Sequence, residues 1–236
     1  MSIFKFKAFE VAQDRCAMKI GTDGVLLGAW APLAHLPESI LDIGTGTGVI
    51  ALMLAQRSEA MTIDALELDD HAYEQAMENF ETSPWGDRLF CYHAHLYEFA
   101  AEMDEEYDLI VCNPPYFSED TKTPSLARNQ ARFEDSMPFD LLIGAVNKLL
   151  SALGTFCVVL PRKREEEFIS LCRLVDLYPN RILRVKGNPK AQPKRSLIEF
   201  SFGESHPKIE KLTIEVARHE YTEKYKALVK DFYMKM

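Results

Sequence analysis

The chain has 236 residues, enough for one large domain or two small ones, and 47% of them are hydrophobic, which is ample for a buried core. The net charge of −9 argues against a generic nucleic-acid-binding protein, and no apolar run reaches the roughly 18 residues that span a bilayer. The five cysteines are scattered without a C-x-x-C pair, and the N-terminus lacks the apolar stretch of a signal peptide. We therefore expect a cytoplasmic protein with neither a disulfide framework nor a metal site.

Strands and helices alternate along the chain, which predicts an α/β fold with a parallel sheet covered by helices on both faces. The last two core strands are expected to form an antiparallel hairpin at the edge of this sheet. The predicted strands are 40–44, 61–67, 89–93, 107–112, 154–160, 181–187, 195–202 and 212–216, and the predicted helices are 48–57, 70–80, 138–152, 164–176 and 221–234.

The first motif in the chain is the start of a helix. Thr22, Asp23 and Gly24 are predicted to cap a helix that begins near Val25, and Lys19 lies just before them. Because a helix N-terminus attracts anions, this point is a candidate for binding the carboxylate of a ligand. The alternative is a capped helix with a solvated lysine.

A glycine-rich turn follows the first predicted core strand. Gly44, Gly46 and Gly48 separate that strand from an apolar helical segment, and Asp42 precedes them. Strand, glycine turn and helix in this order are typical of cofactor binding, because glycine lets the backbone approach a ligand closely. The spacing is G-x-G-x-G, whereas dinucleotide-binding proteins have G-x-G-x-x-G. A pyrophosphate gains nothing from the Asp42 carboxylate, but a ligand with an amino group does.

The next predicted strand ends in an acidic residue, Glu67, 19 residues after Gly48. A carboxylate at such a strand end can accept hydrogen bonds from both hydroxyls of a ribose. An amino group bound by Asp42 and a ribose bound by Glu67 together predict an adenosine cofactor with an amino-acid tail, S-adenosylmethionine.

The sequence Asn113-Pro114-Pro115-Tyr116 ends the apolar strand 107–112. Proline fixes φ and removes a backbone donor, so this loop presents acceptors, namely the Asn113 side-chain oxygen and the Pro114 carbonyl. Tyr116 offers a face on which a base can stack. The motif therefore predicts a site for an amino group on a flat ring, although alone it is also compatible with an ordinary proline-rich loop.

A polar stretch, 117–136, follows this motif directly. Loops of about 20 residues in a compact domain are usually functional or disordered, and we predict a substrate flap. Arg128 and Arg132 are four residues apart and can share a helical face toward phosphates. A disordered surface insert is the alternative.

Positive charge is concentrated in the last third of the chain. Residues 1–161 contain 10 Lys+Arg and 25 Asp+Glu, a net charge of −15, whereas residues 162–236 contain 17 and 11, a net charge of +6. The stretch from Arg181 to Arg195 holds six cations and no acid. Such a stretch can follow the phosphates of a nucleic acid, and the alternative is a solvated hairpin. The candidate substrate-binding residues here are Lys186, Lys190, Lys194 and Arg195.

With these motifs, the chain resembles the class I S-adenosylmethionine-dependent methyltransferases. Within that class it resembles the bacterial tRNA (adenine-N6)-methyltransferases that act beside the anticodon of a valine tRNA. The resemblance spans roughly residues 4–203, and the N-terminal block is its most specific part. It is carried by residues 18–30, 42–48, 83–85, 113–117 and 130–132.

The resemblance implies a Rossmann-like fold with a mostly parallel seven-stranded sheet and a C-terminal antiparallel hairpin. It implies one methyltransferase domain, 1–236, in which segment 1–39 covers the cofactor and substrate, 40–203 is the catalytic core and 204–236 is an appendage. The expected partner is tRNA, and we expect a monomer. The alternative function is that of a protein glutamine N5-methyltransferase of the release-factor type, but that family carries a long helical N-terminal domain.

The resemblance also implies roles for single residues. Asn113 and Pro114 would accept hydrogen bonds from the target amine, with Asn113 also beside the cofactor, while Tyr116, helped by Phe117, would stack on the base and Pro115 would contact it. One position departs from the family pattern, since His95 stands where an acid usually meets the cofactor's adenine amine. A neutral histidine can still accept from an amine, and the Leu96 backbone N–H can donate to the ring. An exposed histidine without that role is the alternative.

Overall fold

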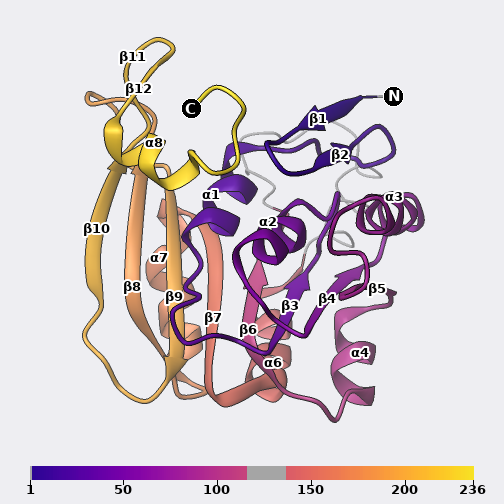
Figure 1. Ribbon diagram of the computed structural model, residues 1–236. Helices are drawn as coiled ribbons and strands as arrows, with labels where there is room; N and C mark the ends of the chain where they lie inside the picture. The colour runs from indigo at the N-terminus through magenta and orange to yellow at the C-terminus, as the bar shows by residue number, and fades with distance from the viewer. Residues whose placement is uncertain (1, 116–136) are drawn as a thin grey trace, which may run out of the picture.

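The computed structural model describes residues 2–115 and 137–236, and most of this chain surrounds one eight-stranded sheet (Figure 1). The strands are β1 Ile3–Lys5, β2 Glu10–Ala12, β3 Ser39–Ile43, β4 Thr62–Glu67, β5 Leu89–His93, β6 Tyr107–Cys112, β7 Leu150–Pro161, β8 Leu177–Lys186, β9 Arg195–Phe202, β10 Lys208–Thr213, β11 Glu215–Ala217 and β12 Glu220–Tyr221. The helices are α1 Thr22–Trp30, α2 Val49–Arg57, α3 Asp70–Glu81, α4 Leu96–Glu102, α6 Phe139–Leu149, the short 3₁₀ helix η2 Arg162–Arg164, α7 Glu165–Arg173 and α8 Glu223–Val229.

The strand order of the large sheet is β10-β8-β9-β7-β6-β3-β4-β5. The five strands from β7 to β5 are parallel, while β9 runs antiparallel to both β7 and β8. The predicted mostly parallel sheet with a C-terminal antiparallel hairpin is therefore confirmed. The predicted number of seven strands and the edge position of the hairpin are wrong, because β10 pairs in parallel with β8 and becomes the edge.

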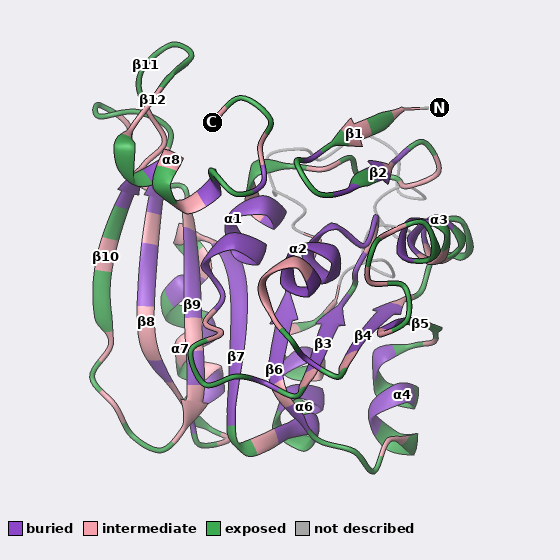
Figure 2. Cartoon of the chain, in the orientation of Figure 1, coloured by how far each residue is buried: buried purple, intermediate pink, exposed green. Residues whose placement is uncertain are grey.

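Alternating side chains of the strands build a core on each face of the sheet. On one face Ile40, Ile63 and Val111 pack with α1, α2, α3 and α8, and on the other Leu41 and Ile110 pack with α4, α6 and α7. Figure 2 shows the central strands buried and the outer strand β10 largely exposed. The helices on both faces agree with the prediction from the α/β pattern.

Several predicted element ends are displaced by packing. The helix predicted over 138–152 ends at Leu149, because the chain passes at once into β7, where Leu150 pairs with Tyr107 of β6. The last predicted strand, 212–216, is divided between β10 and β11, because the chain leaves the large sheet after Thr213. Helices α7 and α8 are shorter than predicted, and β8 begins earlier.

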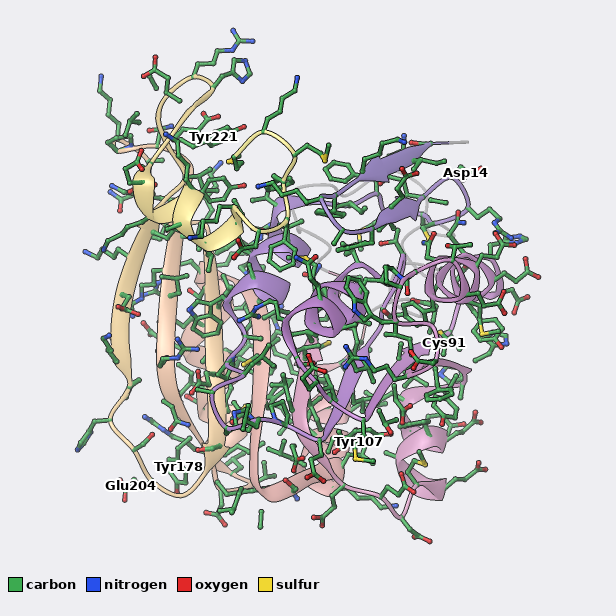
Figure 3. The ribbon with its side chains drawn as sticks, in the orientation of Figure 1. Asp14, Cys91, Tyr107, Tyr178, Glu204 and Tyr221 are labelled. Carbon is green, nitrogen blue, oxygen red and sulfur yellow. The ribbon has the colours of Figure 1, made fainter. Side chains whose placement is uncertain are left out.

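The small hairpins β1–β2 and β11–β12 and the helix α4 were absent from the sequence prediction. Each has seven residues or fewer per element, which is too short for a clear hydrophobic period. Both hairpins lie at the edge of the sheet where the parallel strands end. In Figure 3, Asp14, which follows β2, and Tyr221 in β12 lie on opposite sides of this edge. Tyr107 and Tyr178 lie toward the other end of their strands. Within the described residues, no helix is both long enough and apolar enough to cross a membrane.

Candidate active site

The predicted site residues meet at the carboxyl edge of the parallel strands. Ile43, the last residue of β3, pairs with Leu66 of β4 on one side and with Cys112 of β6 on the other. The glycine turn therefore leaves the sheet between Glu67 and Asn113. This is the point where the order of the strands reverses, and α/β sheets bind ligands there.

The three glycines of the turn all have a positive φ, 70° at Gly44, 57° at Gly46 and 79° at Gly48. Their surroundings differ. Gly44 is exposed, and the position of a Cβ on Gly46 has no atom within 4 Å, so both present bare backbone to open space. Gly48 is buried, and its Cβ would lie 2.5 Å from Cε1 of Phe80 on α3. Gly44 and Gly46 thus form an open turn of bare backbone, called the cradle below, and Gly48 allows close packing against Phe80.

Asp42 lies beneath this turn and is fully buried. Its Oδ2 accepts hydrogen bonds from the Thr45 hydroxyl at 2.6 Å and from the Ala51 backbone N–H at 3.2 Å, so it ties the turn to the first residues of α2. Among the described residues, its Oδ1 has no hydrogen-bond partner. The carboxylate therefore holds the shape of the turn, and the predicted contact with an amino group of the cofactor stays a prediction.

Burial raises the pKa of Asp42 to about 7, even though the bonds from Thr45 and Ala51 favour the carboxylate. The unfolded chain loses this proton near pH 4, so between about pH 4 and pH 7 the folded protein holds one more proton than the unfolded chain. Stability contributed by this group is present below pH 4 and is lost as the pH rises to about 7.

We expect urea unfolding to report this loss when the wild type is compared with Asp42→Asn. The unfolding free energy of the wild type minus that of the variant should fall between pH 4 and pH 7, by a few kcal/mol at most, and stay level from pH 7 to 8. A difference that is flat or rises over pH 4–7 would contradict the raised pKa of Asp42.

Glu67 ends β4 beside the turn and is half-buried. Its Oε2 accepts from the Gly46 N–H at 2.8 Å, and its Oε1 accepts from the backbone N–H groups of Leu68 and Asp69. These bonds hold the carboxylate at the rim of the cradle. A carboxylate has about four acceptor sites, and these three bonds leave acceptor capacity on Oε2.

Helix α1 begins three residues earlier than the predicted start at Val25. Its N-cap is Gly21 without a side-chain cap, so the predicted capping by Thr22 and Asp23 is wrong, and both lie in the first turn. The Asp23 carboxylate instead accepts from Nε of Arg195 at 2.7 Å. Lys19 and Thr22 are exposed close to this helix end. Lys19 therefore lies near the helix N-terminus as predicted, and the ion pair with Arg195 compensates the negative charge of Asp23.

The predicted catalytic loop reaches the same place. The Asn113 Nδ2 lies 3.7 Å from the position of a Cβ on Gly24, so the absence of a side chain there leaves room for the amide between β6 and α1. Pro114 is buried and Pro115 half-buried. Burial raises the pKa of Cys112 well above its usual value, so a thiolate nucleophile beside Asn113 is excluded.

Four predicted residues lie outside the described part of the chain, namely Tyr116, Phe117, Arg128 and Arg132. The remaining cofactor candidates lie at the end of β5. His95 is exposed and precedes the first residue of α4 as its N-cap, and Leu96 is buried. The His95 ring lies 5.6 Å from that of Tyr97, centroid to centroid.

The basic stretch is partly neutralised by acids from other elements. Arg181 pairs with Glu199 on β9, and Arg184 pairs with the buried Glu165 at 2.7 Å. Arg195 pairs with Asp23, so the prediction that this stretch is free of acidic partners is wrong for all three of its arginines. Lys186, half-buried, and the exposed Lys190 and Lys194 lie at or beyond the end of β8, on the same edge as the cradle, since β8 and β10 end there together.

Three buried polar side chains that sequence reasoning missed hold the N-terminal segment over the site. Asn79 of α3 donates to the Thr47 carbonyl in the glycine turn and exchanges two hydrogen bonds with Ala12. Gln75 accepts from the Arg15 N–H, and Gln13 accepts from the Ile20 N–H. No sequence motif identifies these three residues. For Gln75 and Asn79 the signal in the sequence is only that polar residues stand on the face of α3 that is turned to the core.

Comparison with known proteins agrees with this geometry. Residues 23–168 match the model of the methyltransferase small domain family. The chain is 58% identical to the tRNA1(Val) (adenine(37)-N6)-methyltransferase of Flavobacterium psychrophilum, over 99% of this chain and 100% of that protein. It is 57% identical to the protein of the same name from Christiangramia forsetii, over 99% of this chain and 98% of that one.

A solved structure supports the fold alone. A predicted O-methyltransferase from Agrobacterium tumefaciens superimposes with a TM-score of 0.67 and 19% identity, covering 89% of this chain and 96% of that one. The likeness extends the Rossmann-like methyltransferase fold over nearly the whole chain. Within the described residues, no group of three His, Cys, Asp or Glu side chains is placed to hold a metal ion.

Proposed function

Since this chain belongs to the family of the tRNA1(Val) (adenine(37)-N6)-methyltransferases, we propose that it methylates the N6 amine of adenine 37 in tRNA1(Val). The methyl donor is S-adenosylmethionine, which supplies an electrophilic sulfonium methyl when bound. The observation that supports this proposal best is the meeting of Asn113 with the Gly44–Gly48 cradle across the β3–β6 switch point. Relatives named for tRNA, matched along their full length, argue against the release-factor alternative.

The amine of adenine is a poor nucleophile, because its lone pair is delocalised into the ring. The Asn113 oxygen and the Pro114 carbonyl would accept its two hydrogens, so the nitrogen becomes more tetrahedral and its lone pair points toward the methyl group. The gain comes from orientation and from acceptors fixed in advance. No strong base is needed, because the proton can leave after the transfer. Tyr116 and Phe117 would stack on the base, worth roughly 1–3 kcal/mol, with Pro115 beside it.

The cofactor fits the cradle by the chemistry of its groups. Gly44 and Gly46 give it bare backbone, and the Glu67 oxygens would accept from the ribose hydroxyls. Its carboxylate would lie at the start of α1, near Lys19 and Thr22, with Asp23 balanced by Arg195. His95 and the Leu96 N–H would face the adenine ring. Asp42 supports the cradle from below and is a candidate for binding the amino group of the cofactor.

The substrate is a tRNA, which we propose is bound by one copy of the protein in the cytoplasm. Segment 204–236 adds β10 to the sheet and packs α8 against α1, which supports a single domain over 1–236. Arg128, Arg132, Lys186, Lys190, Lys194 and Arg195 would contact the RNA. A dimer mass measured by light scattering would contradict the proposed monomeric state.

The experiment is a nucleoside assay. Purified protein, S-adenosylmethionine and bulk bacterial tRNA lacking this modification are incubated, and digested nucleosides are analysed by mass spectrometry. We expect a new N6-methyladenosine peak that requires both protein and cofactor, and that maps to position 37. A protein that binds the cofactor but yields no methylated nucleoside would overturn the proposal and direct attention to a protein amide.

A further inference from the structure

A basic hollow lies away from the cradle, beneath the loop that joins β8 and β9. Its volume is about 160 Å³, and its polar lining comes from Arg184, Lys186, Lys190, Gln192 and Lys211, with prolines at its rim. No acidic side chain lines it among the described residues. Lys211 comes from β10, the strand beyond the predicted basic stretch, so only the pairing of β10 with β8 brings it there.

The cations of the hollow are not equally available. Arg184 is held by the buried Glu165, and the Lys186 ammonium donates to the Pro189 carbonyl at 2.8 Å. Lys190 and Lys211 are exposed, and neither side chain has an ion pair or hydrogen bond to a described residue. These two ammonium groups are therefore free to bind an anion, and a compact ammonium binds phosphate as a point charge.

The loop around the hollow is held in shape before any ligand binds. The Asn188 side chain accepts from the N–H groups of Lys190 and Ala191, at 3.1 Å and 3.0 Å. The Lys194 N–H donates to the Val185 carbonyl, and the Arg162 N–H donates to the Lys194 carbonyl. Binding a ligand would therefore cost little additional conformational entropy in this loop.

The hollow lies on the same edge of the sheet as the catalytic loop. Val185, near the end of β8, pairs with Arg195, which in turn pairs with Pro161 at the end of β7, the neighbour of β6. Three strand spacings separate β6 from β8, roughly 14 Å at about 4.8 Å each. Arg195 also forms an ion pair with Asp23 on α1.

Acidic side chains near the opposite edge strand, β5, disfavour a path of the RNA backbone in that direction. A second hollow, next to β5, is lined by Glu98 and Glu102 together with apolar and aromatic side chains. Asp104, Glu105 and Glu106 precede the first residue of β6, so they lie at the amino edge of the strands and not beside the catalytic loop. An RNA backbone would be repelled beside β5, so it is expected to leave the catalytic loop toward β8 and β10.

We propose that the hollow formed by Lys186, Lys190, Gln192 and Lys211 binds a backbone phosphate of the tRNA, several nucleotides from the target adenosine. The inference rests on the proposed function and specifies how the RNA lies on the protein. The site gives affinity and orientation, because phosphate contacts fix the register of a nucleic acid and carry no information about base identity. It makes no contact with the reacting atoms.

The test uses the double variant Lys190→Gln/Lys211→Gln with unmodified tRNA. At physiological salt we expect KM for tRNA to rise roughly 10-fold with kcat and cofactor affinity unchanged, and the salt dependence of tRNA binding to become less steep by about 1 in log–log slope. The matched control is Lys208→Gln, three residues before Lys211 on β10 and exposed, at the other end of the strand. It should behave as wild type.

Phosphate-ethylation interference locates the contact on the RNA. Wild type should be sensitive to ethylation of a phosphate outside the target nucleotide, and the double variant should lose that sensitivity alone. If an active wild type and the double variant have equal KM and equal salt slopes, the phosphate site is wrong and the proposed function stands. If wild type neither methylates nor binds tRNA, both are overturned.

Discussion

Replacing Asn113 by alanine is expected to reduce kcat for tRNA methylation at least 10²–10³-fold, the loss that follows removal of one preorganised polar group at a reacting centre. The side chain would accept a hydrogen from the target amine and orient its lone pair. Alanine removes the acceptor but leaves the prolines and the glycine cradle in place. Affinity for S-adenosylmethionine should therefore change much less than kcat.

Two measurements separate this role from a structural one. Titration calorimetry should give a cofactor Kd for Asn113→Ala within a few-fold of wild type, and the thermal midpoint should be similar, because Asn113 is only half-buried. Asn113→Asp keeps an acceptor of the same length and should retain more activity than the alanine variant. Equal losses of cofactor binding and of methyl transfer would contradict the assigned role.

The second large effect is expected at Gly48, where alanine should lower the unfolding free energy by about 2–5 kcal/mol. A φ of 79° costs an L-residue roughly 1–2 kcal/mol, and a Cβ 2.5 Å from the buried Phe80 ring adds about 1–3 kcal/mol of overpacking. Chemical denaturation measures the loss. Phe80→Leu removes the ring atoms that collide, so the double variant should be more stable than the sum of the single losses predicts.

Gly46→Ala is the matched control in the same turn. It carries a comparable φ of 57°, but its Cβ would meet no atom within 4 Å. We expect only the backbone cost of about 1–2 kcal/mol in stability, together with a raised KM for S-adenosylmethionine, because the methyl group projects into the cradle. A Gly46 variant as unstable as Gly48→Ala would show that strain in φ, rather than contact with Phe80, dominates at both positions.

The surroundings of Gly44, Gly46 and Gly48 differ in a way that their spacing in the sequence does not predict. The pattern G-x-G-x-G predicted a turn with close backbone approach, and all three φ values confirm the need for glycine. It did not separate the two glycines that face open space from the one that packs on Phe80. Likewise, the acidic side chain of Asp42 suggested a contact with a ligand, but in the buried position it accepts hydrogen bonds from Thr45 and Ala51.

The parallel core, the glycine turn, the strand end at Asn113 and the resemblance to a methyltransferase family could all be predicted from the sequence. These features depend on local patterns, namely alternating elements, fixed spacing and residues with special backbone freedom. The motif positions converge because the carboxyl ends of parallel strands share one edge.

The contacts between segments distant in the chain became visible in the three-dimensional fold alone. It joined β10 to β8 and so brought Lys211 to the basic hollow, paired Asp23 with Arg195, neutralised Arg184 with Glu165, and placed Asn79 between the glycine turn and the N-terminal hairpin. Each of these contacts joins residues at least 19 positions apart. Such pairings depend on strand order and on complementary burial, which no local pattern of the sequence encodes.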